Sequence, residues 1–348
     1  LKHSVRLWSV KKTREIKLEK RKRKMSLLVA GAGTGALLFS SCHHRRPKLH
    51  FFSPPTSAAH HNRPTSIRSS PSPASRFPVC QVSRRSTDPP ETDGVTKAVQ
   101  VALWVMEGVY ILWLFLLPYA PGDPVWAISA ETVNSLIGLS LNFFFVLPLM
   151  NAVGIHLIEA PVLHPASEAL FNFVIGWTFL FAPLLFTDRR RDRYGGSLEV
   201  LWGAQMFLTN TFLIPYMAIR MNETAPANRS SERSQLGRVM TNGAPVVGLI
   251  GAAACLVSAI WGLYGRPDGG FGGVNERWEF LINYLGSDRV AYAFVWDICL
   301  YIIFQPWLIG DNLQNVKKSK VGIVKYLRFV PVMGLIAYLL CLNLDDEL

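Results

Sequence analysis

Residues 290–309, VAYAFVWDICLYIIFQPWLI, decide the fold, because Asp297 is the single charged residue among them. A helix of about 20 such residues crosses about 30 Å, the thickness of a bilayer's hydrocarbon core. Lipid offers no partner to an unpaired backbone group, so a segment of this composition must be helical. The stretch therefore predicts a transmembrane helix with a carboxyl group near its middle.

Six further apolar stretches approach the same length. They run approximately over residues 99–119, 132–153, 169–186, 198–219, 244–264 and 326–344. The stretch 132–153 contains Asn142 and Pro148, so a re-entrant loop remains an alternative to a span there. A stripe of small residues, Ala254, Ser258 and Gly262, predicts close packing of the helix at 244–264. The expected fold is an all-α, polytopic transmembrane helix bundle of six or seven spans.

The overall charge is misleading as a guide to partners. The chain has a formal net charge of +12, with 50% hydrophobic and 17% charged residues. The positive charge is concentrated before residue 88, and the remainder carries more acidic than basic side chains. A soluble enzyme and a nucleic-acid-binding protein are both disfavoured. The lipid bilayer is the predicted partner.

The basic front end resembles a targeting sequence. Residues 1–24 are interpreted as translated leader, with synthesis starting at Met25. Residues 25–87 lack acidic side chains and are rich in Ser, Arg and Pro. This composition is typical of a disordered chloroplast transit peptide, with cleavage expected near residues 79–81. A secretory signal at residues 27–39 is the alternative. The transmembrane helix-bundle domain is then 88–348, in the thylakoid or inner envelope membrane.

Basic side chains also predict orientation. The connection at residues 317–328 is rich in Lys and Arg, which places it on the stromal side. Seven spans then put the acidic residues 345–347 on the far side. The basic cluster at residues 189–193 falls on that far side as well, against the rule.

Two carboxyl groups, Glu107 and Asp297, lie well inside predicted spans, and no Lys or Arg lies at comparable depth. Each must be protonated, hydrogen-bonded, beside water or bound to a cation. Asp297, Tyr301 and Gln305 follow one another at intervals of four, which aligns them on one helix face. Further intramembrane polar candidates are Asn142, Gln205 and Asn210. The alternative interpretation of all these residues is interhelical hydrogen bonding.

The loop between the second and third stretches contains His156, Glu159 and His164. Their spacing fits no metal-binding motif, so neither a metal nor another cofactor is assigned. Free thiols are expected of the later cysteines, since none has CxxC spacing. The chain has no paired nucleophile and base, no Walker loop and no GxSxG motif. No catalytic residue is therefore named, and an enzyme is not favoured.

Two regions carry a family resemblance. The first is residues 164–186, continuing into 212–220, and the second is residues 287–297, continuing into 304–312. They resemble an uncharacterised family of multi-pass membrane proteins of cyanobacteria and plant chloroplasts. The resemblance implies a plastid membrane protein and gives weight to Asn172, Asp297 and Asp311. It supplies no reaction.

Two function hypotheses follow. The first is a small transporter or a proton or ion pathway that uses intramembrane carboxylates. The second is a non-catalytic factor that assembles or stabilises a photosynthetic membrane complex, with a pigment as a candidate ligand. In the second case the partners are other thylakoid or envelope membrane proteins. A polar cavity open to one side at mid-membrane depth would favour the first hypothesis, and a dry bundle with a flat outer face would favour the second.

The targeting hypothesis predicts import. A fluorescent fusion whose translation starts at Met25 should enter chloroplasts and be shortened near residues 79–81, because the segment is basic and lacks acids. Microscopy and amino-terminal sequencing of the processed protein are the measurements. Delivery to the endoplasmic reticulum, with glycans on Asn222 or Asn228, would contradict it.

Overall fold

The computed structural model describes residues 91–222 and 234–343. Within these two ranges the chain forms helices and turns, with one isolated bridge between Val316 and Leu342 and no strand. The all-α expectation is confirmed for this part of the chain. The expectations for residues 1–24, 25–87 and 345–347 lie outside the described residues.

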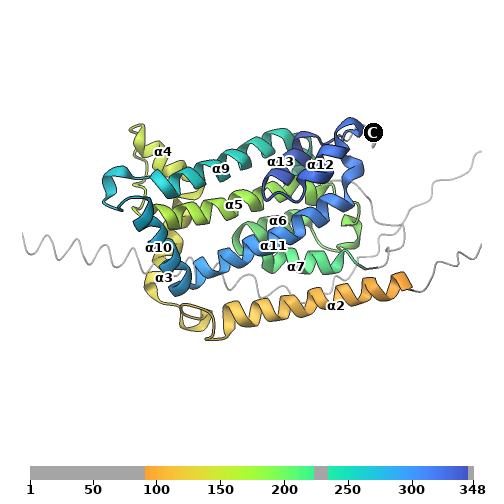
Figure 1. Ribbon diagram of the computed structural model, residues 1–348, viewed down its shortest axis with the longest axis horizontal. Coiled ribbons are helices and arrows are strands. Elements are labelled where there is room, and N and C mark those ends of the chain that lie inside the picture. Colours follow the sequence, from red (N-terminus) through yellow and green to blue (C-terminus); the bar gives the residue numbers. More distant parts are fainter. Residues whose placement is uncertain (1–90, 223–233, 344–348) are drawn as a thin grey trace, which may run out of the picture. The chain divides into compact units, whose positions relative to one another are not determined.

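Four helices form the long elements of the bundle (Figure 1). They are α2 (Glu91–Ile111, continued by the π-helical turn Leu112–Leu116), α5 (Pro165–Phe186), α9 (Ala244–Tyr264) and α11 (Arg289–Asp311). Each is long and apolar enough to cross a membrane. The described chain is therefore compatible with an integral membrane protein that contacts lipid.

The central helix is α5, which is buried along most of its length. Its start is fixed by His164, whose side chain accepts a hydrogen bond from the Ala166 amide, and by Pro165 in the first turn. Small residues let α9 pack closely against it: a side chain on Gly251 would overlap Leu180. The expected stripe of small residues lies at this contact, where Ala254 and Ser258 are buried.

The expected span at 198–219 is two helices, α6 (Leu198–Leu208) and α7 (Asn210–Ile219). Thr209 separates them with φ 39° and ψ −111°. Both outer ends of the pair lie beside the end of α5. At the start of α6, Glu199 accepts from the amide of Leu236 in the first turn of α8 (Gln235–Asn242), where Gly237 lies next to Phe186 at the end of α5. Just beyond α7, Arg220 binds Asp188. The pair is thus a hairpin that enters the bundle and returns to the same end.

The expected span at 326–344 is also replaced by a hairpin. Its arms are α12 (Val321–Leu327) and α13 (Met333–Leu340), and Val332 adopts φ 63° between them. The bridge between Val316 and Leu342 joins the two ends of the hairpin. An eight-residue helix rises about 12 Å, which is too short to cross the hydrocarbon core.

The stretch 132–153 enters from the opposite end of the bundle. It forms α3 (Ala130–Leu141), the short turn Phe143–Phe145 and α4 (Val146–Ala152), bent by 41°. This shape fits a broken span or a re-entrant loop. The preceding turn is held by Arg289 at the start of α11, and the following loop leads to the start of α5. Both ends therefore lie at one end of the bundle, which favours the re-entrant alternative.

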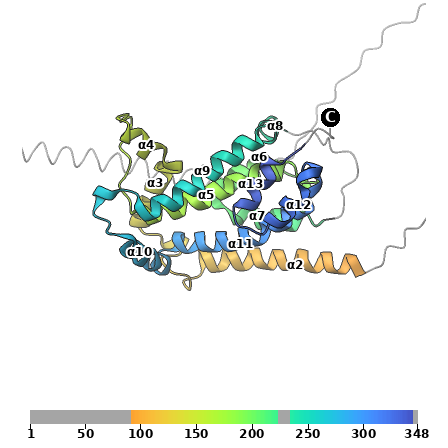
Figure 2. The same ribbon diagram turned by 45° about the horizontal axis from the view of Figure 1, so that its top comes forward.

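The two ends of the bundle are named here by their buried charges. The Arg220 end contains the last residues of α5, α7 and α11, and the Glu168 end contains the first residues of α5 and α11. Figures 1 and 2 show α6, α7, α12 and α13 toward the former, and α3, α4 and α10 (Val274–Ser287) toward the latter. The expectation of six or seven spans is not confirmed. In the described ranges, four helices are long and apolar enough to cross a membrane, or five if the bent pair is counted as one span.

This topology changes the sidedness of the charges. Among the described Lys and Arg residues, only Arg266, Arg277 and Arg289 lie at the Glu168 end. The basic segments 189–193 and 317–328 both lie at the Arg220 end, so the conflict expected from seven spans disappears. Asn343 donates to the Asn315 carbonyl at 2.7 Å, which keeps the end of the described chain there as well.

The topology predicts which engineered cysteines share a side. Asp192→Cys and Lys318→Cys should react with a membrane-impermeant maleimide from the same side of sealed vesicles, and Asp268→Cys only from the other. The reason is that α9 lies between Asp192 and Asp268, and α11 returns the chain before Lys318. The unsubstituted protein, with Cys255, Cys299 and Cys341, measures the background. Labelling of Asp192→Cys and Lys318→Cys from opposite sides would restore the seven-span arrangement.

Candidate functional site

One face of α11 carries three buried polar side chains, Asp297, Tyr301 and Gln305, exposed by 1%, 0% and 1%. The alignment expected from their spacing is thus present on the buried side of the helix. The described structure has no hydrogen bond that links one of these three side chains to another. Instead, the first and the last each hold the tip of a hairpin.

Asp297 holds the tip of the α6–α7 hairpin. Its Oδ1 accepts hydrogen bonds from the Tyr110 hydroxyl at 3.0 Å, the Thr209 hydroxyl at 2.7 Å and the side-chain Nδ2 of Asn210 at 2.7 Å. The same Nδ2 also donates to the Asp297 carbonyl at 3.3 Å. Among the described residues, no donor reaches Oδ2 and no Lys or Arg forms an ion pair with this carboxyl group. One oxygen is therefore saturated, and the other can take up a proton or a cation.

The break at Thr209 orients a helix end toward this carboxyl group. Positive φ is unusual for Thr, a β-branched residue, and such conformations cost about 1–3 kcal/mol. Helix α7 begins at the next residue, so its free amide groups and its positive dipole end lie beside Asp297. The local geometry therefore favours negative charge at a position where burial opposes it.

Several buried polar atoms around this tip have no hydrogen-bond partner among the described residues. They are both amide atoms of Gln205, Oδ1 of Asn210, Oε2 of Glu107 and the hydroxyl of Thr211. Gln100 donates to the Ala218 carbonyl at 3.1 Å, near the end of α7, whereas Tyr110 binds Asp297 beside the start of α7. Helix α2 therefore runs antiparallel to α7. That register places Glu107 opposite the first turn of α7. Polar groups with unused bonding capacity thus gather at mid-bundle depth.

Gln305 holds the tip of the α12–α13 hairpin. Its Oε1 accepts from the indole of Trp177 at 3.0 Å and from the Val332 amide at 3.1 Å. Its Nε2 donates to the carbonyls of Arg328 and Val330, at 2.9 and 2.8 Å. The amide group is fully used, which indicates a structural role. Tyr301 shares a hydrogen bond of 2.6 Å with Thr178 on α5.

Asn142 and Asn172 lie at a different place, around the buried carboxylate of Glu168. Arg266 donates to both oxygens of Glu168, at 2.7 and 3.0 Å, and the Trp261 indole donates at 2.8 Å. Asn142 donates to the same carboxylate, and Asn172 donates to the Asn142 carbonyl at 3.2 Å. This cluster fastens the α3–α4 segment to α5. It is separate from the Asp297 site.

Asp311 belongs to the network that closes the Arg220 end. Asp188 and Arg220 are both fully buried and form two bonds of 2.9 Å. Tyr216 donates to Asp188 at 2.6 Å and Asn312 at 2.9 Å, and Arg220 reaches Asp311 at 3.0 Å. The network ties the ends of α5, α7 and α11 together.

The charge states of this pair follow from opposing effects. Burial alone would raise the pKa of Asp188, but the Arg220 guanidinium and the other donors lower the pKa below its usual value. Burial likewise opposes the charge of Arg220, whereas Asp188 raises its pKa overall. Because the pKa of Asp188 is lower in the folded protein, its ionised form stabilises the fold at pH values above the ordinary pKa of an aspartate. That stabilisation is lost as the pH falls through the lowered pKa.

The three loop candidates do not assemble. His156 and Glu159 are exposed, whereas His164 caps α5 and stacks on Phe280 at 3.5 Å between ring centroids. Burial, and then the charge of Arg277, lowers the pKa of His164. In residues 91–222 and 234–343, no group of three or more His, Cys, Asp and Glu side chains could hold a metal ion.

Sequence reasoning missed several partners in these clusters. Glu168, Asp188 and Arg220 lie at or just beyond the ends of apolar stretches, where charged residues are ordinary. Tyr110 carried a signal, because it follows Glu107 by three residues and so shares its helix face. Thr209 carried none, since its conformation depends on tertiary contacts. No known protein-family model, curated protein or solved structure matches this chain.

The buried ion pair gives a prediction for stability. Arg220→Met should lower the free energy of unfolding by about 3–5 kcal/mol, because it leaves the buried charge of Asp188 without a cation. Asp188→Leu should cost less, because Arg220 keeps its ion pair with Asp311. The double variant should lose less than the sum of the two. Thermal unfolding of the detergent-solubilised protein measures all three changes. Additive losses would show that the two charges do not depend on each other.

Proposed function

We propose that this protein is a membrane transporter in which Asp297 is the proton-binding group of a proton-linked pathway. The observation that carries the proposal is the position of its carboxyl group at the tip of the broken α6–α7 hairpin. Discontinuous helices at mid-membrane depth are where secondary transporters build their ion and substrate sites. The membrane of the chloroplast is the proposed location, on the composition of residues 25–87.

Two opposing effects make the Asp297 site suited to changing its charge. Burial without a basic partner disfavours the carboxylate. Three donors on Oδ1 and the start of α7 favour it. Both the charged and the protonated form are therefore accessible to this carboxyl group. Oδ2, which receives no hydrogen bond from the described residues, is the position for the proton.

Protonation also changes how firmly the hairpin is held. Charge-assisted hydrogen bonds are about twice as strong as neutral ones, so loss of the charge weakens the bonds from Thr209 and Asn210 together. The contacts of Gln305 with the second hairpin involve no titrating group. Proton binding thus weakens the attachment of the α6–α7 hairpin and leaves the α12–α13 hairpin in place. In this way, protonation of Asp297 would be coupled to movement of the α6–α7 hairpin.

One observation favours the second function class. Only 22% of the apolar window of α2 is buried, so most of this helix faces outward. Its outer face presents Trp104, Val105, Val109 and Trp113. A factor that assembles or stabilises a photosynthetic membrane complex would use such a face against its partner. In that case Asp297 serves only to hold the hairpin.

Substitution at Asp297 separates the two functions. Asp297→Asn is nearly isosteric and retains an acceptor for Oδ1's donors, so the protein should accumulate normally. It should fail to restore a loss-of-function plant, because the proton site is gone. Asp297→Leu should reduce accumulation in either case, since the donors on Thr209 and Asn210 lose their partner. Complementation, with membrane abundance quantified by immunoblot, is the measurement.

Infrared spectroscopy adds a direct readout of the proton. The carbonyl band of a protonated carboxylic acid should change when the pH of the purified protein is stepped, and Asp297→Asn should remove that change. The control variant is Glu279→Gln, which removes an exposed carboxyl group far from both hairpin tips. Full rescue by Asp297→Asn at normal abundance would exclude the carboxyl group from the mechanism and leave the assembly role.

A further inference from the structure

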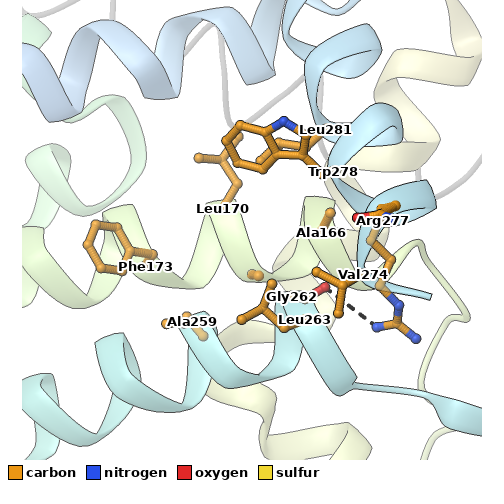
Figure 3. Close-up of a pocket in the computed structure, with 13 residues that line it drawn as sticks. Ala166, Leu170, Phe173, Ala259, Gly262, Leu263, Val274, Arg277, Trp278 and Leu281 are labelled. Atoms are coloured by element: carbon orange, nitrogen blue, oxygen red, sulfur yellow. Dashed lines mark hydrogen bonds between the residues drawn. The ribbon is translucent and has the colours of Figure 1, made fainter.

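A groove of about 340 Å³ lies between α5, α9 and α10 at the Glu168 end (Figure 3). Small residues create it: Ala166 and Ala169 on α5 lie across from Ala259 and Gly262 on α9. Its remaining walls are mainly apolar, formed by Leu170, Phe173, Leu263, Trp278 and Leu281. A groove of this size and lining suits a hydrocarbon chain.

Arg277 lies at one end of the groove and is 5% exposed. Its guanidinium donates to two carbonyl oxygens, of Gly272 at 3.2 Å and Gly262 at 3.5 Å. No carboxylate of the described residues forms an ion pair with it. The nearby Arg266, by contrast, is neutralised by Glu168. The groove therefore ends at an uncompensated positive charge.

Arg289 gives a comparison at the same end of the bundle. It is 6% exposed and also lacks an ion-pair partner among the described carboxylates. Its guanidinium, however, donates five hydrogen bonds to carbonyls of the turn after α2, four of them between 2.8 and 3.2 Å. That side chain is saturated by the backbone. Arg277 makes two bonds, one of them weak, and so retains donors for an anion.

The chemistry of the two parts identifies the occupant. A soluble anion would match Arg277 and leave the apolar walls without a partner. A neutral lipid would match the walls and leave the charge uncompensated. An arginine presents a fork of donors that fits phosphate, sulfate or carboxylate groups. Trp278 is 62% exposed beside the groove, as expected of an aromatic side chain at the membrane interface.

We propose that this groove binds one bilayer lipid with an anionic headgroup. One acyl chain lies between α5 and α9, and the headgroup accepts hydrogen bonds from Arg277. The site lies at the Glu168 end and shares no residue with the Asp297 site. The bound lipid would stabilise the packing of α10, the helix that precedes α11, against α5 and α9. The proposal does not depend on a transport function.

Spin-labelled phosphatidylglycerol and phosphatidylcholine with identical chains are the probes. The full-length protein, reconstituted in neutral vesicles, should immobilise the anionic probe more strongly than the neutral one. Arg277→Gln should weaken binding of phosphatidylglycerol about tenfold, because charge-assisted hydrogen bonds are lost. It should leave phosphatidylcholine unchanged. Electron paramagnetic resonance of the labelled chain is the measurement.

A second variant tests the groove without altering the charge. Ala259 is exposed at the groove, so Ala259→Phe should fit and block the chain, which weakens binding of both probes. Lys318→Gln, at an exposed lysine of the Arg220 end, should change neither. Equal binding of the two probes by the unsubstituted protein would overturn the proposal. So would an unchanged affinity in Ala259→Phe, or an equal loss in Lys318→Gln, which would indicate general electrostatics.

Discussion

Polar groups inside a membrane need partners, and at its two broken hairpins this bundle supplies them from the polar face of α11. Two hairpins enter from the Arg220 end and turn within the apolar part of the protein. Thr209 and Val332, at their tips, have positive φ, so regular helical bonds are interrupted there. Asp297 accepts from the side chains of Thr209 and Asn210 at one tip, and Gln305 binds backbone groups of Arg328, Val330 and Val332 at the other. Loss of either side chain would leave polar groups of a hairpin tip without a partner away from water.

This arrangement explains which parts of the fold the sequence could predict. The spans α2, α5, α9 and α11 are long and uninterrupted, and their hydropathy alone locates them. The two stretches that become hairpins are equally apolar. Whether such a stretch crosses or turns back depends on a partner elsewhere in the chain, and hydropathy does not contain that information. Pro331 precedes one break, but the other has no glycine or proline at Thr209.

Of the candidate site, too, the sequence predicts one part and not the other. Asp297 is recognisable because a carboxyl group in an apolar helix is costly, and the same argument finds Glu107. The spacing of Asp297, Tyr301 and Gln305 correctly places them on one face. It cannot say that they serve three different neighbours. Asn142, an equally good candidate by depth, binds Glu168 instead, because α3 enters from the other end.

The hairpins also differ in when their partners become available during synthesis. Gln305 precedes the Arg328 carbonyl by 23 residues, so the second hairpin can dock as soon as it follows α11 into the membrane. Thr209 is made 88 residues before Asp297. Until α11 has been inserted, the first hairpin has apolar arms and a polar tip with no protein to receive it, and the interfacial layer of the bilayer is the only favourable place for it. If the helices insert in chain order, the first hairpin reaches its final position only after α11 has entered the membrane, by an inward movement of a segment inserted earlier.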